Sequence, residues 1–570
     1  MSSLKTGILS ASVDADGNLT LINTRTNRLL LRSVSPYFLR PSLDGSPVEI
    51  HLTDIKSEGD KITLSYEGAA VDDFVVEIQA IPGEEALDFK GTFRSVTESQ
   101  INALEIFASG TQVNFNEAIN FRNRHYTHRT WPELILGGKG FETNTYSTDW
   151  QFAPHPSAIL FKADKEGLFL GTLDLPRSFG LYLSIADYRV KHCYLDYGTL
   201  PNGQKLVAGE EFQSPTIRVF YRDDIGEYEA YTDFGRMLVE NGKIPNPAKK
   251  KREGWWTEPL YCTWIDQCFG SHTKMLDDLQ AQASSEELIS AVSFVNEKLI
   301  HRAVAEIEKE GYPIRTILLD DGWQISRGQW EPHPKRFPDL RKLVDELHSK
   351  GYKVVVWWNW AEIMPDAQVD PSHLMAGGQL NRHNARVRDY SSPLTQEEYL
   401  KPLFHKLFSS DPECYNLDGV KTDFLADKVH PDMPLHDASW RGEENYFFHV
   451  TRLFYTELKK HKPDGIHIGC AGNYWLAEYV DINRTYDVSS SDWREHEERA
   501  RMLMATTPGC PVAYDFHNHL EKMDGWFESA KQLGASVEIG NVLWFKRDRF
   551  SEAEHTSADY RAVLHQGLKK

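Results

Sequence analysis

The chain has 570 residues, which is more than one ordinary hydrophobic core holds, so we expect two or three domains. It is 41% hydrophobic and 26% charged, a globular balance that excludes both a disordered chain and a bundle of membrane helices. The 63 Lys and Arg residues against 83 Asp and Glu residues give a formal net charge of −20. Such an acidic surface repels phosphate backbones, so we expect no nucleic-acid partner.

The spacing of the cysteines and the length of the apolar segments indicate the cellular compartment of the protein. The six cysteines are scattered without a Cys-x-x-Cys pair, so nothing in the sequence requires an oxidising environment. The first residues lack the apolar core of a signal peptide. No run approaches the roughly 18 apolar residues that a membrane helix needs. We therefore expect a cytoplasmic protein without membrane contact, and the sequence leaves its oligomeric state open, a homo-oligomer included.

The first part of the chain has the pattern of a β domain. Short segments with alternating polar and apolar residues recur between turn residues up to about residue 220. They include residues 19–22, 61–66, 73–78, 158–161, 167–171 and 180–185. Many short strands at this spacing predict a large antiparallel β-supersandwich over residues 1–224. A helical pattern and then a segment rich in Pro and Lys follow, so residues 225–253 are predicted to form a helical linker.

After the linker the pattern changes to strand, polar loop and helix, repeated. The strand-like segments are residues 260–264, 316–319, 353–358, 419–424, 465–470, 486–491, 511–514 and 537–540. This alternation predicts a (β/α)8 barrel over residues 254–550, with a short C-terminal extension at 551–570. A doubly wound open sheet is the alternative, but the sequence contains no Gly-rich phosphate loop that would favour it.

Carboxylates follow several of the predicted barrel strands. Asp320 and Asp321 follow the second strand, Glu362 follows the third, and Asp423 and Asp492 stand at later strand ends. One such Asp alone would most simply cap the next helix. Several of them, with Trp residues between, favour a site at the carboxyl end of the barrel. Glycosidic cleavage needs two carboxyl groups, one as proton donor and the other as nucleophile or base, together with an aromatic wall for the sugar ring.

Two of these carboxylates have neighbours that suit different roles. Lys421 lies two residues before Asp423, so on a strand both side chains point to the same face. The ammonium would then keep Asp423 ionised, as a nucleophile requires. Asp492 directly precedes Trp493, and an apolar neighbour raises the pKa of a carboxyl group, as a general acid requires.

Several motifs in this region occur together in one known family. They are residues 261–264 (YCTW), 318–323 (LLDDGW), 335–340 (KRFPDL), 388–391 (RDYS), 419–423 (GVKTD), 469–472 (GCAG) and 491–492 (SD). In type and order they resemble glycoside hydrolase family 36, which contains α-galactosidases and plant galactosyltransferases of the raffinose and stachyose type. The resemblance covers about residues 255–545, and the preceding β region fits the supersandwich of that family.

The resemblance implies a retaining hydrolysis of terminal α-galactosides by double displacement. Asp423 would attack the anomeric carbon, and Asp492 would protonate the leaving oxygen and then activate water. Asp320 and Asp321 would accept hydrogen bonds from the 4- and 6-hydroxyls of galactose, and Lys421 would bind ring hydroxyls. The two catalytic carboxyl groups of a retaining enzyme stand about 5–5.5 Å apart.

The resemblance also implies the rest of the binding site. Trp358 would stack on the sugar, and Cys470 would lie near its 2-hydroxyl. Trp264 and Trp323 belong to the matching motifs, and His517 suits a position near the sugar. The expected ligand is a small-molecule or oligosaccharide substrate, and no cofactor or metal is expected.

Departures from the family pattern keep alternatives open. The segments around Asn359 and Asn473 lack the family's usual sequences, so a different α-glycoside, or transglycosylation instead of hydrolysis, stays an alternative. The pair His517 and His519 offers a His-x-His arrangement, as in a metal-dependent hydrolase, although zinc sites need at least three ligands. A third alternative is a carbohydrate-binding protein that uses Trp131 or residues 122–128 of the β region.

Overall fold

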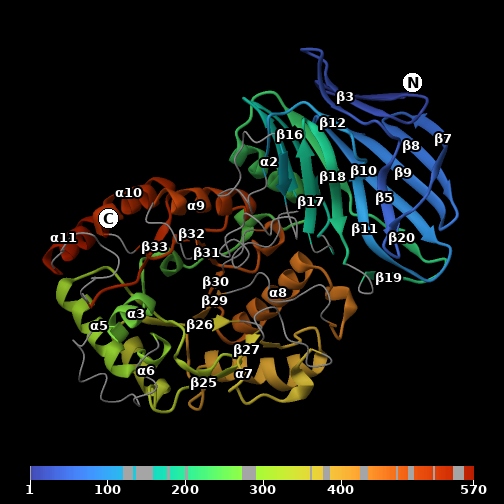
Figure 1. The fold of residues 1–570 in the computed structure, drawn as a ribbon. Coiled ribbons are helices and arrows are strands. Elements are labelled where there is room, and N and C mark those ends of the chain that lie inside the picture. Colours follow the sequence, from blue (N-terminus) through green and yellow to red (C-terminus); the bar gives the residue numbers. More distant parts are fainter. Residues whose placement is uncertain are drawn as a thin grey trace. The chain divides into compact units, whose positions relative to one another are not determined.

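The computed structural model describes most of the chain (Figure 1). The described residues are 2–119, 133–136, 158–175, 177, 180–198, 203–272, 291–359, 362–375, 385–423, 434–469, 473–485, 493–517, 520–543 and 557–569. The chain divides into two compact units: Met1–Pro245 with Ser439–Phe447, and Asn246–Ala438 with Phe448–Lys570. The division at Pro245 falls inside the segment predicted as a linker.

The first unit contains two large antiparallel sheets. The first has the strand order β1 (Ser2–Thr6), β2 (Leu9–Val13), β3 (Leu19–Asn23), β4 (Arg28–Arg32), β12 (Gln112–Val113), β18 (Arg189–Asp196), β11 (Ser99–Phe107), β5 (Phe38–Leu43) and β6 (Ser46–Pro47). Beside this path lie β14 (Glu133–Leu136), β17 (Gly180–Ala186) and β19 (Gln204–Leu206). The second has the order β13 (Glu117–Ile119), β15 (Ala158–Ala163), β16 (Glu166–Thr172), β21 (Ile217–Arg222), β10 (Ala86–Ser95), β9 (Val71–Ile81), β8 (Lys61–Gly68) and β7 (His51–Glu58), with β20 (Glu211–Gln213) on β10.

Alternation along the strands explains why these sheets pack face to face. On β8 the residues Ile62, Leu64 and Tyr66 are buried, whereas the residues between them are partly exposed. Since successive side chains of a strand point to opposite faces, each sheet has one apolar face. These faces share a single hydrophobic core. The predicted antiparallel sandwich is thereby confirmed.

Helix α2 (Glu227–Glu240) belongs to the same unit. Its residues Tyr231 and Phe234 contact Phe169 of β16, with ring centroids 4.9 and 5.0 Å apart. Gly171 on the same strand makes room for this helix, because a Cβ atom there would lie 2.6 Å from the ring of Phe234.

The second unit contains a closed barrel of eight parallel strands. The strands are β22 (Leu260–Cys262), β23 (Thr316–Leu319), β26 (Lys353–Asn359), β29 (Gly419–Asp423), β30 (Ile466–Gly469), β31 (Ile482–Arg484), β32 (Val512–Tyr514) and β33 (Ser536–Ile539). The predicted (β/α)8 barrel is confirmed. The sixth strand of the barrel is β31, and residues 486–491, which were predicted to form a strand, lie outside the described residues.

The barrel strands alternate with helices. The α-helices are α3 (Trp264–His272), α5 (Glu297–Glu310), α6 (Leu340–Ser349), α7 (Lys401–Phe408), α8 (Glu443–His461), α9 (Arg494–Thr506), α10 (Met523–Leu533) and α11 (Ser557–Gly567). Shorter elements are η3 (Pro247–Lys249), η4 (Gly254–Thr257), η7 (Ala291–Ser293), η8 (Pro371–His373), the π-helical η10 (Thr395–Leu400), η11 (Ala438–Trp440), η12 (Tyr474–Leu476) and η13 (Leu520–Lys522). Two small hairpins are β24 (Gln324–Ser326) with β25 (Gln329–Pro332), and β27 (Glu362–Ile363) with β28 (Arg386–Val387).

Helix α5 shows how the sequence sets these boundaries. The side chain of Asn296 accepts a hydrogen bond from the backbone N–H of Leu299 and so caps the first turn. Gly311 ends the helix in the left-handed conformation, at φ +68°. The C-terminal helix α11 is attached to α5 by the ion pair of Arg561 with Glu306, at 2.7 Å.

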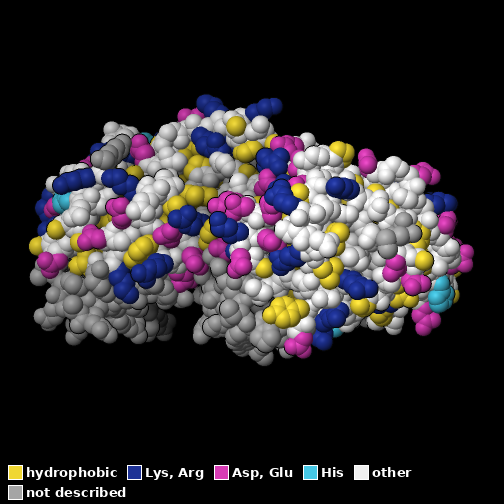
Figure 2. All heavy atoms as spheres, turned by 90° about the horizontal axis from the view of Figure 1, so that it is seen from above, with side chains coloured by type: hydrophobic (Ala, Val, Ile, Leu, Met, Phe, Trp, Pro, Cys, Tyr) yellow, Lys and Arg dark blue, Asp and Glu magenta, His cyan; other side chains and the backbone are white. Residues whose placement is uncertain are grey.

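The surface does not concentrate charge of one sign on the face that Figure 2 draws. Acidic and basic side chains are interspersed there with small groups of hydrophobic ones (Figure 2). Among the described residues, no helix combines the length and the apolar character needed to cross a membrane.

Asp418 joins several elements at the amino end of the barrel. It is 1% exposed, and its carboxylate accepts hydrogen bonds from His348 (2.6 Å), Lys353 (3.2 Å) and the backbone N–H of Val354 (2.9 Å). Burial alone would raise the pKa of Asp418, but His348 and Lys462 hold this pKa below its ordinary value of 3.8. The ionised carboxylate therefore ties β29 to α6 and β26.

We expect Asp418→Asn to lower the free energy of unfolding by about 2 kcal/mol at pH 7, because it removes the charge from a buried, paired site. A lowered pKa stabilises the folded state above the unfolded value, and this contribution disappears as the pH falls below about 3.8. The difference between wild type and variant, measured by urea denaturation, should therefore shrink in acid. Glu308→Gln, at an exposed pair, is the control. Equal stability of wild type and Asp418→Asn at pH 7 would contradict this account.

Candidate active site

The charged residues of the barrel gather at one end. Because all eight strands are parallel, their carboxyl ends meet at the same mouth. Asp423 is the last residue of β29, Arg484 ends β31, and Asp515 directly follows β32. Asp320 and Asp321 directly follow β23.

Asp423 is held at both carboxylate oxygens. The guanidinium of Arg484 lies 2.5 Å from one oxygen, and the indole N–H of Trp357 donates to the other at 2.9 Å. Asp423 is 6% exposed and Arg484 is fully buried. Arg484 also forms an ion pair with Asp515, which is itself fully buried. A cation and a hydrogen-bond donor on opposite oxygens favour the ionised form and fix its orientation.

Lys421 lies two residues before Asp423 and belongs to a second charge cluster. Its ammonium lies 2.9 Å from a carboxylate oxygen of Asp320 and 3.2 Å from one of Glu538. The thiol of Cys262 donates to Asp320 at 3.2 Å. Burial would lower the pKa of Lys421, but Asp320 and its other acidic neighbours raise it well above its ordinary value. The direct cationic contact of Asp423, which the sequence pattern assigned to Lys421, is made by Arg484.

Glu538 was not among the predicted site residues. It stands on β33, is 1% exposed, and shares the ammonium of Lys421 with Asp320. Burial raises the pKa of Glu538 to about 7; Lys421 opposes this shift and the charge of Asp515 adds to it. One ammonium therefore serves two carboxyl groups here, and Glu538 is the one that gains a proton near neutral pH.

Asp321 has partners of its own although it follows Asp320 directly. Arg327 donates to one carboxylate oxygen at 2.6 and 3.0 Å, and Gln324 donates to the other at 2.7 Å. Burial raises the pKa of Asp321 against the lowering effect of Arg327. Gly322 makes the turn after the pair: its φ is +110°, and a Cβ atom there would lie 2.0 Å from the carbonyl oxygen of Val292.

The aromatic residue beside Asp423 is Trp357, which is 1% exposed, whereas Trp358, which was predicted to stack on the sugar, does not contact Asp423 in the structure. Successive residues of β26 point to opposite sides, so the two indoles diverge. Trp358 is fully buried among Trp330, Phe404 and Phe454, with ring centroids 4.7, 5.3 and 5.5 Å away. Its indole packs against the helices α7 and α8.

Two further predicted tryptophans support the barrel. Trp323 is fully buried, and its indole N–H donates to the carbonyl oxygen of Trp357 at 2.8 Å. It therefore positions the strand that carries Trp357. Trp264 begins α3 and is partly buried against the core of the barrel.

Several predicted residues lie outside the described residues. These are Asp492, Cys470 and His519, together with Trp131 and residues 122–128. The structure leaves their roles as predictions.

His517, the other member of the predicted His-x-His pair, is 5% exposed. Its ring stacks on Trp526, with centroids 6.3 Å apart, and meets His496 edge to face at 5.8 Å. His496 lies in the first turn of α9. Burial lowers its pKa well below 6.5, so its ring is neutral, and it shares a hydrogen bond of 2.8 Å with Thr485.

The two asparagines that depart from the family pattern have structural partners. Asn359 ends β26 and donates to the carboxylate of Glu362 at 2.9 Å. The side chain of Asn473 accepts from the backbone N–H of Trp475 at 2.8 Å and so caps η12.

Sequence reasoning missed four contributors: Arg484, Trp357, Glu538 and Asp515. Arg484 was missed because its strand has three residues and ends in a charge, a pattern typical of a loop. The signal for Trp357 is strand periodicity, which places Trp357 and Trp358 on opposite sides of β26. Glu538 alternates with Val537 and Ile539 and therefore carries the signal of an inward position.

Comparisons with known proteins agree with this architecture. Residues 287–518 match the family described as "Glycosyl hydrolases family 31 TIM-barrel domain". An α-galactosidase variant of family 36 from Geobacillus stearothermophilus, crystallised with stachyose, has a similar fold, with a TM-score of 0.60 at 12% identity. That similarity covers 99% of this chain and 85% of the solved one.

Two curated relatives match at the level of sequence. A galactosaminidase from Flavonifractor plautii that acts on A type blood α-D-galactosamine is 24% identical over 366 residues, or 61% of this chain. A probable α-galactosidase C from Aspergillus flavus is 24% identical over 474 residues, or 76% of this chain. The matches span 29% and 55% of the lengths of these relatives.

The fold and the barrel sequence are similar to those of two glycoside hydrolase families. A two-sheet β region followed by a closed parallel barrel is the fold of the family 36 structures, and the barrel sequence matches family 31. The chain is therefore similar to family 31 in the sequence of its barrel and to the family 36 structures in its fold. The family 36 resemblance of the motifs is confirmed at the level of fold.

The raised pKa of Glu538 predicts a pH-dependent stability. Between about pH 4.5 and 7 the folded protein holds a proton that the unfolded chain releases, so the free energy of unfolding falls as the pH rises. We expect Glu538→Gln to remove this fall, which amounts to about 3 kcal/mol. Urea denaturation at several pH values measures it, with Glu528→Gln on the exposed side of α10 as control. An unchanged slope would show that Glu538 titrates normally.

Proposed function

We propose that the protein is a retaining α-glycosidase that hydrolyses terminal α-galactosides, with Asp423 as nucleophile and Asp492 as general acid and base. The observation that carries the proposal is the setting of Asp423. Its two oxygens are fixed by Arg484 and Trp357 at the carboxyl end of the barrel. A nucleophile that is ionised and immobile meets the first requirement of double displacement.

The charge balance of the site supports the same chemistry. Arg484 pairs with two buried carboxylates, Asp423 and Asp515, and Lys421 pairs with two more, Asp320 and Glu538. Acidic groups thus outnumber cations in these described clusters. A buried excess of negative charge stabilises the positive charge that develops at the anomeric carbon in the transition state.

The proposed reaction has two displacements. Asp423 forms a bond to the anomeric carbon while the glycosidic C–O bond breaks, and Asp492 gives its proton to the leaving oxygen. Asp492 then takes a proton from water, whose oxygen bonds to the anomeric carbon and releases Asp423. A sugar or polyol in place of water gives transglycosylation by the same steps.

The proposed sugar contacts follow from the same positions. Asp320 and Asp321 keep lone pairs for sugar hydroxyls, and Trp357 replaces Trp358 as the aromatic residue at the nucleophile. Lys421, Cys470, Trp264 and His517 stay proposed as binding residues. Solved family 36 enzymes in complex with raffinose and stachyose support an α-galactoside of this kind as substrate.

A second candidate substrate is a terminal α-galactosaminide. The match to the Flavonifractor plautii galactosaminidase favours it. So do the departures around Asn359 and Asn473, at positions that the family resemblance places toward the 2-hydroxyl side. A cytoplasmic location, the absence of a cofactor and any homo-oligomer rest on the sequence alone and stay predictions.

We expect Asp423→Asn to lower kcat/KM for a nitrophenyl α-galactoside by about 10³-fold or more, because the amide cannot form the covalent intermediate. Hydrolysis of a panel of nitrophenyl α- and β-hexosides, α-galactosaminides included, measures this loss and identifies the sugar. Asp464→Asn, at a half-exposed aspartate near the amino end of β30, should keep full activity. Turnover indifferent to Asp423→Asn would contradict the proposed mechanism.

A further inference from the structure

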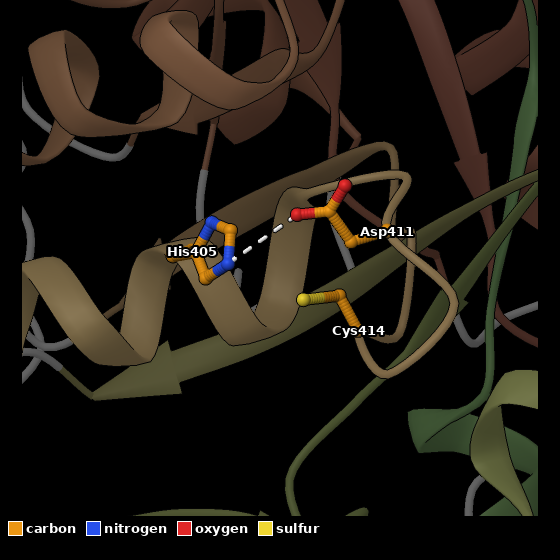
Figure 3. A group of neighbouring side chains, drawn as sticks. All are labelled: His405, Asp411 and Cys414. Carbon is orange, nitrogen blue, oxygen red and sulfur yellow. Dashed lines mark ion pairs between the residues drawn. The ribbon is translucent and has the colours of Figure 1, made fainter.

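Three metal-ligating side chains meet at the end of the barrel opposite the active site (Figure 3). His405 lies on α7, and Asp411 and Cys414 lie in the loop from α7 to β29. One potential ligand atom from each lies within 4.8 Å of the others. In Figure 3 the imidazole and the carboxylate face each other, at 3.5 Å, and the thiol points toward both.

A fourth potential ligand lies beside His405. His461 is the last residue of α8, and its ring meets the ring of His405 edge to face, with centroids 5.1 Å apart. Two imidazoles, one carboxylate and one thiolate form a mixed N, O and S donor set that suits Zn²⁺ in a closed tetrahedral site.

The backbone holds the loop in place. Arg341 donates to the carbonyl oxygens of Asp411 (2.6 Å) and Cys414 (2.8 Å). The N–H of Cys414 donates to Asp411 at 2.9 Å, and that of Leu417 donates to Leu407 of α7 at 2.9 Å. These hydrogen bonds fix the backbone that carries Asp411 and Cys414.

The side chains around the group leave the ligand atoms accessible. Cys414 is 3% exposed, whereas the side chains of His405 and Asp411 are 49% and 62% exposed, so an ion enters from solvent. The neighbouring ammonium groups have other partners: Lys406 donates to the carbonyl oxygen of Glu413, and Lys460 to the carboxylate of Glu457 at 2.5 Å.

We propose that His405, Asp411, Cys414 and His461 bind one structural Zn²⁺ ion. The thiol of Cys414 gives its proton to solvent, and the two resulting anionic ligands neutralise the ion. The site would clamp the loop before β29 to the end of α8. It serves no catalytic step, because the five residues of β29 place Asp423 about 13 Å further along the strand.

Co²⁺ and Zn²⁺ titrations of the full chain, after treatment with a chelator, test the proposal. We expect one equivalent to bind, with the thiolate-to-cobalt charge-transfer band of a cysteine ligand. Cys414→Ser should abolish the band, and His461→Gln should weaken binding by about tenfold or more. Cys510→Ser changes a similarly buried cysteine of the same unit. This variant should retain both the charge-transfer band and the affinity of the wild type for the metal. A band that persists in Cys414→Ser, or no bound equivalent in the wild type, would overturn the assignment.

Measurements of Tm and of hydrolytic activity distinguish a structural ion from a catalytic one. Saturating Zn²⁺ should raise the Tm of the wild type and of Cys510→Ser but not that of Cys414→Ser. The Tm values without metal show whether each variant folds. Hydrolysis well below the Tm should be the same before and after chelation, and a loss of activity on chelation would overturn the structural role.

Discussion

The pairing of Arg484 with Asp423 is the interaction on which the rest of the site depends. Burying an isolated carboxylate costs free energy. A guanidinium at 2.5 Å offsets that cost only if the guanidinium, which is buried as well, has its other N–H groups paired too. Asp515 pairs with the guanidinium from the next strand. Three of the barrel strands contribute to this group: β29 carries Asp423, β31 carries Arg484, and Asp515 directly follows β32. A closed parallel barrel brings these ends together without any loop rearrangement.

The second cluster shows the same principle with a different outcome. Lys421 is shared by Asp320 and Glu538, and the three come from β29, the end of β23 and β33. Here the raised pKa of Glu538 reduces the excess of negative charge. The site therefore places a guanidinium next to Asp423, whereas the carboxyl group with the raised pKa, Glu538, lies in the other cluster.

The sequence was enough to predict the architecture and the acids, because both have local signals. Alternation predicted the strands of the sandwich, the strand and helix rhythm predicted the barrel, and the strand ends pointed to Asp320, Asp321 and Asp423. The partners could not be predicted in the same way. Which cation faces Asp423 depends on strand order and stagger around the barrel, and Arg484 is 61 residues away in sequence. The choice between Trp357 and Trp358 depends on a single step of register along β26.

The central claim is that Asp423 forms a covalent bond to the sugar. An activated fluorinated α-galactosyl reagent that forms the intermediate quickly and releases it slowly tests this claim directly, with the labelled peptide identified by mass spectrometry. The account predicts one sugar attached to the peptide that contains Asp423, at its carboxylate, and no label in Asp423→Asn. A label on another carboxylate would contradict the account. So would turnover that releases the β-anomer first without any label.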